Sequence, residues 1–249
     1  MIEVDRVGRS FAVGRRRERR TVHAVQDLSF HVGAGEFVGY LGPNGAGKST
    51  TIKMLTGILA PTSGHIRVAG LDPARRRTAL ARRIGVVFGQ RTTLWWDLPL
   101  KDSFELIRHL YKVEQVQFRR RLDELTDLLG LAEFMKTPVR QLSLGQRMRG
   151  DITAALLHSP AVLVLDEPTI GLDVVSKAAM REFLRRLNAE HGTTVLLTTH
   201  DLGDIEKLCR RVMLIDHGRL TFDGTLDDLR ATVPEEDSIE DVVARLYRG

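Results

Sequence analysis

Apolar residues divide the chain into short strand-like runs and longer helical patterns, which alternate for most of its length. Strands are predicted where apolar residues are most concentrated, at residues 24–32, 37–41, 84–88, 162–166, 194–198 and 212–216. All of these except 24–32 and 84–88 are nearly wholly apolar, as is typical of strands buried on both faces of a sheet. The alternation predicts an α/β domain.

The pattern changes at residues 97–157, where it becomes almost wholly helical. Leu122, Leu125 and Leu129 fall on one helical face there, and Gly130 is a helix stop signal. An all-helical subdomain is therefore expected at 97–157, inserted into the α/β frame.

We expect a single domain over residues 1–249. Its parts are an α/β core at 1–96 and 158–224, the helical subdomain, and a short helical tail at 225–249. The tail is predicted to dock on the body, because its apolar residues recur at helical spacing: Ile239, Val242, Val243 and Leu246.

Composition places the chain among ordinary soluble proteins, with 249 residues of which 43% are apolar and 28% charged. No run approaches the roughly 18 consecutive apolar residues of a membrane span. The N-terminus has neither the basic nor the apolar region of a signal peptide. Cys209 is the only cysteine and lies in an apolar helical pattern. An inert buried thiol and a cytoplasmic location are therefore expected.

A run rich in arginine at residues 15–20 supplies part of the net charge of +5. A solvated loop between two strands is the favoured interpretation. Attraction to anionic lipid headgroups is the alternative. No recognised nucleic-acid motif accompanies the charge, so no nucleic-acid partner is expected. The histidines show no metal-ligand spacing.

The strongest chemical signal is the segment 42–50, which fits the phosphate-loop pattern G-x-x-x-x-G-K-[ST] between an apolar strand and a helical run. Its glycines allow backbone N–H groups to surround phosphate oxygens, and the helix N-terminus adds partial positive charge. Lys48 is predicted to reach the β- and γ-phosphates of a nucleotide, and Ser49 to hold Mg²⁺. The nucleotide-binding residues are Gly42, Pro43, Asn44, Gly45, Ala46, Gly47, Lys48, Ser49 and Thr50.

A second signal is the apolar strand 162–166, which ends in Asp166 and is followed by Glu167. This places both carboxylates at the edge of the sheet where ligands bind in open α/β folds. Asp166 is predicted to position Mg²⁺, and Glu167 to orient or deprotonate the attacking water. A strand ending in two acids is a weak signal alone, and becomes strong beside a phosphate loop.

Three further segments resemble the motifs of the ABC ATPases. Residues 141–147 resemble the family's signature, 166–173 its Walker B strand and D-loop, and 199–201 the segment of its switch histidine. Gln90 matches the Q-loop glutamine, and Phe11 stands where the family has an aromatic residue that stacks on adenine. The order and spacing match over essentially the whole chain.

The resemblance implies the fold of an ABC phosphate-loop ATPase, with a mixed sheet, an inserted helical subdomain and an N-terminal antiparallel β region. It implies that Glu167, His200 and Gln90 are catalytic, and that Ser49, Gln90 and Asp166 hold Mg²⁺. Two copies are expected to enclose two ATP molecules, with the phosphate loop of one facing the signature of the other. The further residues implied in nucleotide contact are Ser143, Gly145, Gln146 and Asp173.

The implied function is ATP hydrolysis coupled to transport. The expected partners are a second nucleotide-binding subunit, identical or different, and a separate integral membrane permease. The chain would then be cytoplasmic, held on the inner face of the cell membrane through the permease. A non-transport ABC ATPase, serving cofactor assembly or nucleic acids, is the alternative.

Two features refine this expectation. Leu144 occupies a position at which the family usually has glycine, while Ser143 and Gly145 are retained. Together with residues 88–99, this variant resembles a bacterial branch of type-2 exporter-like ATPases, which favours export. Trp95 and Trp96 lie within that segment. One is expected to be core and the other exposed, and a contact with the membrane subunit is the functional interpretation.

Overall fold

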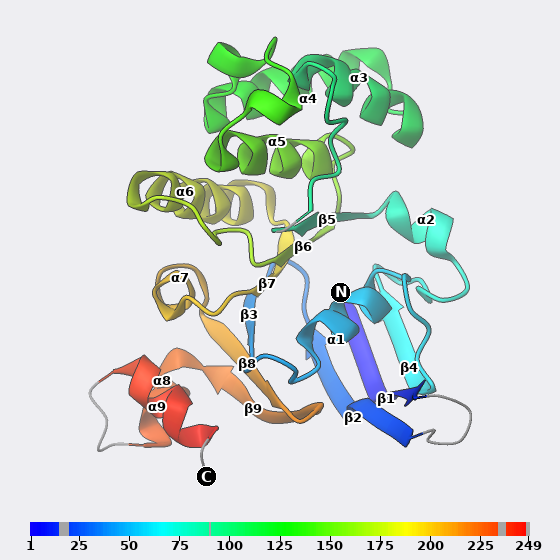
Figure 1. Cartoon of the computed structure of the whole chain (residues 1–249), viewed down its shortest axis with the longest axis vertical. Coiled ribbons are helices and arrows are strands. Elements are labelled where there is room, and N and C mark those ends of the chain that lie inside the picture. The colour runs from blue at the N-terminus through cyan, green and yellow to red at the C-terminus, as the bar shows by residue number, and fades with distance from the viewer. Residues whose placement is uncertain (15–19, 90, 234–237, 248–249) are drawn as a thin grey trace.

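The computed structural model describes residues 1–14, 20–89, 91–233 and 238–247. Two sheets organise the chain (Figure 1). The smaller is antiparallel and has the order β2-β1-β4, with β1 at Ile2–Val13, β2 at Arg20–Val32 and β4 at Ser63–Val68. This sheet is the N-terminal antiparallel region that the family resemblance implied.

The larger sheet has the order β5-β6-β7-β3-β8-β9. Its first five strands in that order are parallel, and β9 pairs antiparallel with β8, which makes the sheet mixed, as expected. The strands are β3 (Phe37–Leu41), β5 (Ile84–Phe88), β6 (Val162–Asp166), β7 (Thr194–Thr198), β8 (Arg211–Asp216) and β9 (Arg219–Thr225). The predicted ABC ATPase fold class is therefore confirmed.

The edge strands β4 and β9 had not been predicted, and no range had been predicted for β1. In β4 only Ile66 and Val68 are buried, and in β9 exposed and half-buried residues alternate. Strands at a sheet edge carry few apolar residues, so their sequences lack the dense apolar runs of β3, β6 and β7.

Helices connect and cover the strands (Figure 1). Helix α1 (Lys48–Leu55) follows the phosphate loop, and α2 (Arg77–Ala81) lies between β4 and β5. Helices α6 (Val174–His191) and α7 (Leu202–Leu208) follow β6 and β7 of the larger sheet. The C-terminal part contains α8 (Leu226–Ala231) and α9 (Ile239–Leu246). Ile239, Val242 and Val243 of α9 are buried, so the predicted amphipathic tail helix docks on the body.

The region from 97 to 157 is helical, as predicted, and forms the end of the molecule drawn at the top of Figure 1. It contains α3 (Leu100–Tyr111), α4 (Gln115–Leu129), α5 (Leu144–Leu156) and two short 3-10 helices, η1 (Ala132–Phe134) and η2 (Val139–Gln141). Gly130 ends α4 in a left-handed conformation, with φ of 59°. Among the described residues, no helix is both long enough and apolar enough to cross a bilayer.

Two expectations about single residues need correction. Trp95 and Trp96 are both exposed, at 42% and 49%, so the interpretation that one belongs to the core is wrong. Both lie in the loop between β5 and α3. Cys209 is buried as expected, but it follows α7 in an extended conformation, and burial raises the pKa of its thiol.

Candidate functional site

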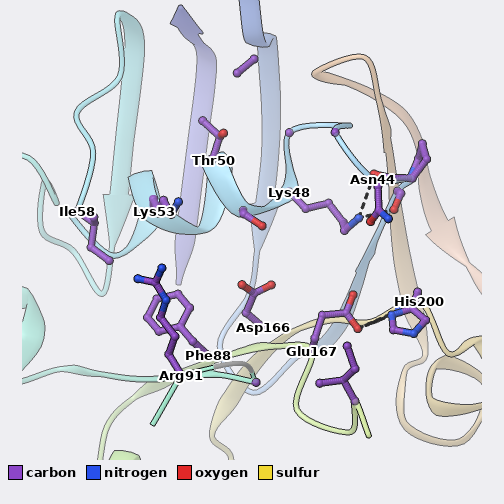
Figure 2. A pocket seen from close by; sticks show the side chains of 18 residues that line it. Asn44, Lys48, Thr50, Lys53, Ile58, Phe88, Arg91, Asp166, Glu167 and His200 are labelled. Carbon is purple, nitrogen blue, oxygen red and sulfur yellow. Dashed lines mark hydrogen bonds and ion pairs between the residues drawn. The ribbon is translucent and has the colours of Figure 1, made fainter. Parts of the chain in front are cut away.

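A cavity of about 880 Å³ opens at the carboxyl edge of the larger sheet. The phosphate loop, the end of β6 and the segment after β7 converge on it (Figure 2). Its lining includes most of the predicted nucleotide residues, together with both predicted carboxylates and the predicted switch histidine: Gly42, Pro43, Asn44, Gly45, Gly47, Lys48, Ser49, Thr50, Asp166, Glu167 and His200.

The phosphate loop packs closely against the backbone of strand β2 in the same chain. Gly47 has φ of 107°, and a Cβ at this position would lie 2.5 Å from the carbonyl oxygen of Ala24. Only glycine fits there, which explains this position of the motif. Helix α1 begins at Lys48, so its free N–H groups face the cavity and favour an anion.

Lys48 is oriented by the loop that precedes it. Its Nζ donates hydrogen bonds to the carbonyl oxygens of Gly42 and Pro43, the latter at 3.1 Å. Burial lowers the pKa of the Lys48 ammonium, while the carboxylates of Glu167 and Asp166 act in the opposite direction. The cavity therefore holds a cation opposite two acids, an arrangement suited to a phosphate group and a metal ion.

Asp166 and Glu167 occupy different environments although they are adjacent. Asp166 Oδ1 accepts a hydrogen bond from Thr198 Oγ1 at 2.7 Å. Glu167 has φ of 56°, a left-handed conformation that is uncommon for a residue with a side chain. Its backbone N–H donates to the carbonyl oxygen of Thr198 at 3.0 Å. Such backbone geometry is often found at functional sites.

His200 contacts the second carboxylate. Its Nδ1–H donates to Glu167 Oε2 at 2.7 Å, drawn as a dashed line in Figure 2, and its backbone N–H lies 3.3 Å from the same oxygen. At Gly89, a Cβ would lie only 2.1 Å from the carbonyl oxygen of Glu167, so glycine allows the end of β5 to approach the carboxylate segment. The arrangement places a carboxylate, an imidazole and Lys48 around one cavity.

Several predicted residues lie away from this cavity. Ser143 caps α5, where its Oγ accepts from Gln146 N at 3.2 Å and its N–H donates to Gln146 Oε1 at 2.9 Å. Asp173 caps α6 and accepts two hydrogen bonds from Ser176, which lower its pKa. Gly145 follows Ser143 at the start of α5.

Three other predictions end differently. Phe11 lies in β1 opposite Val22, with the Arg9 guanidinium 4.6 Å from its ring centroid, and is not among the described lining residues. Ala46, a residue of the phosphate loop, is buried and does not line the cavity. Its carbonyl oxygen accepts a hydrogen bond from Gly218 N at 2.9 Å. Gln90 falls outside the described residues, as do Arg15, Arg16, Arg17, Glu18 and Arg19 of the basic run.

The structure adds two cations to the cavity that sequence reasoning had missed. Lys53 lies in α1 and Arg91 directly follows Gln90, and both line the cavity on the side of Ile58 (Figure 2). Lys53 lies in the helix that the phosphate loop begins and Arg91 lies within residues 88–99, but neither had been assigned a role. Both add positive charge to the cavity.

The fold and the cavity together define a phosphate-loop nucleotide hydrolase. A family model described as ABC transporter matches residues 25–170. The chain is 34% identical over 232 residues to the ABC transporter ATP-binding protein NatA of Bacillus subtilis (strain 168), which covers 93% of this chain and 94% of that protein. It is 40% identical over 208 residues to the daunorubicin resistance ATP-binding protein DrrA3 of Streptomyces coeruleorubidus, covering 84% of this chain and 65% of that protein.

A solved structure is also similar, the dimeric post-hydrolysis state of the ATP-binding cassette MJ0796 bound to ADP and Pi. The TM-score is 0.80 at 27% identity, over 91% of this chain and 99% of that one. The chain therefore belongs to the ABC transporter family, in which it is an ATP-binding and ATP-hydrolysing subunit.

Proposed function

We propose that Glu167 is the catalytic base for ATP hydrolysis and that His200 orients it and the attacking water. The observation that carries this proposal is the 2.7 Å contact between His200 Nδ1 and Glu167 Oε2, in the cavity that Lys48 also lines. Lys48 would hold the β- and γ-phosphates, as in other phosphate-loop enzymes. The uncommon backbone conformation of Glu167 supports a functional constraint on its direction.

Mg²⁺ is the proposed metal, with Ser49, Asp166 and Gln90 as its ligands. The hydroxyl of Ser49 and the carboxylate of Asp166 both line the cavity, and oxygen atoms of this kind suit Mg²⁺. Mg²⁺ is commonly bound by one or two carboxylates together with phosphates and water. Asp166 would be the single carboxylate ligand here. When bound, the ion would neutralise charge that develops on the phosphates.

A second nucleotide-binding subunit, identical or different, is proposed to complete the site. Ser143, Gly145, Gln146 and Asp173 are implied in nucleotide contact, yet they lie away from the cavity of their own chain. The related MJ0796 cassette is a dimer with ADP and Pi. A partner whose signature faces this cavity would explain both facts. Hydrolysis would then remove contacts that hold the dimer closed.

The membrane partner is proposed to be a separate permease on the inner face of the cell membrane, with export as the direction. Relatives include a daunorubicin resistance protein, which is consistent with export. The docking surface would include Trp95 and Trp96, both exposed at the entrance to the helical subdomain, 97–157. Replacing either by Ala should reduce co-purification with the permease while ATPase activity in solution persists.

Glu167→Gln tests the catalytic assignment. We expect turnover to fall by about 10²- to 10⁴-fold, the usual contribution of general acid–base catalysis. ATP binding should persist, because Lys48 and the phosphate loop are unchanged, so the ATP-bound dimer should accumulate. The matched control is Glu182→Gln, an exposed glutamate of α6 that pairs with Arg185. Near-normal turnover of Glu167→Gln would contradict the proposal.

A further inference from the structure

Asp151 is a buried carboxylate in the middle of α5, with 5% of its surface exposed. Its Oδ1 accepts three hydrogen bonds from the chain that follows Gln90. Thr92 Oγ1 and Thr93 N each lie 2.9 Å from this oxygen, and Thr93 Oγ1 lies at 3.2 Å. A buried carboxylate is costly unless such partners satisfy it, so this contact constrains both segments.

Further contacts hold the same stretch, residues 92–97, which we call the linker segment, against α5. A Cβ on Gly150 would lie 3.0 Å from Leu94 Cδ1, so glycine permits the close approach of linker and helix. At the N-terminal end of α5, the Arg147 guanidinium lies 5.5 Å from the Trp96 ring centroid. Arg140, just before α5, forms a 2.8 Å ion pair with Asp97.

The two segments carry different parts of the proposed machinery. The linker segment begins after Gln90 and Arg91, of which Arg91 lines the nucleotide cavity, and it contains the exposed Trp95 and Trp96. Helix α5 begins at the signature residues Ser143 and Gly145. Asp151 is the buried polar connection between them.

We propose that Asp151 is a positioning residue that makes the linker segment and the signature helix α5 move as one body. A shift of the linker segment, caused by nucleotide or by a docked permease, would then move Ser143 and Gly145 with it. The inference rests on the proposed dimer with composite sites. It assigns to Asp151 no contact with nucleotide, and its effect is exerted through Thr92 and Thr93.

The test uses the two tryptophans as a built-in reporter, since Trp95 and Trp96 are the only tryptophans of the sequence. In full-length Glu167→Gln protein, ATP with Mg²⁺ is titrated. Tryptophan emission reports the linker segment and light scattering reports dimer formation. We expect the two signals to change together over the same ATP range in this parent.

Three further variants are made in that parent. Asp151→Ala removes the acceptor, and should lose most of the ATP-dependent emission change and need more ATP for dimerisation. Asp151→Asn keeps an oxygen in the place of Oδ1 and should restore both signals, which a charge effect alone would not do. Asp127→Ala, an exposed acid of α4, is the control and should match the parent.

The outcomes separate this inference from the composite site. If the parent dimerises and Asp151→Ala shows an emission change and dimerisation like the parent's, the inference is overturned. If the parent itself fails to dimerise with ATP, the composite site fails and the inference with it. Should Asp151→Ala not fold, Thr92→Val with Thr93→Ala removes both hydroxyl donors from the other side and must show the same two losses.

Discussion

The nucleotide cavity and the signature end of α5 differ in how complete they are within one chain. In the cavity, Lys48, the adjacent Asp166 and Glu167, and His200 come from three separate segments and line one space. At the start of α5, Ser143 is satisfied locally, because its side chain and that of Gln146 cap the helix reciprocally. The first region is an assembled site, and the second is a helix end with its own hydrogen bonds made.

This difference teaches what a partner must supply. Ser143 Oγ accepts the capping hydrogen bond from Gln146 N at 3.2 Å, which leaves its O–H able to donate to a phosphate that approaches. Asp173 likewise already accepts two hydrogen bonds from Ser176. The signature side therefore has its own hydrogen bonds without nucleotide, and in the proposed dimer it would contribute when a second cassette brings ATP to it.

The largest effect on ATP binding is expected from a substitution in the nucleotide cavity. Lys48→Ala should weaken ATP binding by about 10- to 100-fold, from the loss of hydrogen bonds by a charged group, and abolish measurable hydrolysis. Lys53→Ala, in the same helix and cavity, should have a smaller effect because it lies outside the phosphate motif. Nucleotide binding by calorimetry measures both, and equal losses would contradict the special position of Lys48.

A buried acid behind the nucleotide cavity should be next in size. Asp204 of α7 is fully buried and forms an ion pair with Arg181. Its carboxylate also accepts hydrogen bonds from the hydroxyls of Thr169 and Thr199. Asp204→Ala leaves Arg181 without this partner and should cost about 3–5 kcal/mol of unfolding free energy.

The control for that prediction is Asp201→Ala. Asp201 is partly exposed and pairs with Lys177 at 2.7 Å, so its removal should cost about 1 kcal/mol or less. Denaturant unfolding measures both variants. Similar costs for the two would contradict the larger cost expected from the burial of Asp204.

Phe11→Ala tests the part of the nucleotide site that lies away from the cavity. If Phe11 stacks on adenine, the variant should lose about 1–3 kcal/mol of ATP affinity, the range for base–aromatic stacking. Maximal turnover should change little, since the ring is not among the described residues around the phosphate loop. The ATP dependence of hydrolysis checks this, and an unchanged ATP requirement would mean that another group covers the base.

The smallest effect concerns pH. Burial raises the pKa of Asp151, against the hydrogen bonds of Thr93 and Thr92 and the charge of Arg147. A raised folded-state pKa means that the folded protein keeps this proton to higher pH than the unfolded chain does. The stability gained from it is fully present below the unfolded pKa of about 3.9, and is lost as pH rises through the folded pKa.

Asp151→Asn removes this titration while keeping an acceptor oxygen. The unfolding free energy of the unmodified chain, measured relative to Asp151→Asn, should therefore fall as pH rises from about 4. Denaturant titrations of both proteins at several pH values measure the difference. A difference that grows with pH would contradict the sign of the shift.

The sequence predicted the features that depend on local pattern. The phosphate loop needs its glycines at fixed spacing, and the buried strands need continuous apolar runs, so both could be recognised without a structure. Residues 97–157 were predicted as helical because their apolar spacing differs from that of the strands.

Features that depend on tertiary packing could not be predicted in the same way. Edge strand β9 carries no fully buried residue, so its pattern resembles a loop. One of Trp95 and Trp96 was predicted to be buried, yet both are exposed. The sequence could not show this, because burial depends on neighbours distant in sequence. Asp151 carries no signal in the sequence, since only folding brings α5 beside Thr92 and Thr93.

The comparison between the two regions is tested most directly by mixing two inactive variants. Glu167→Gln disables the nucleotide cavity of its own chain. Ser143→Glu disables the signature end of α5, because it places a negative charge where the phosphate of ATP bound to a partner would approach. A mixed dimer contains one site with an intact Glu167 from one chain and an intact Ser143 from the other. ATPase activity of the mixture should therefore rise well above the sum of the separate variants. A mixture no more active than that sum would contradict a catalytic site built from two chains.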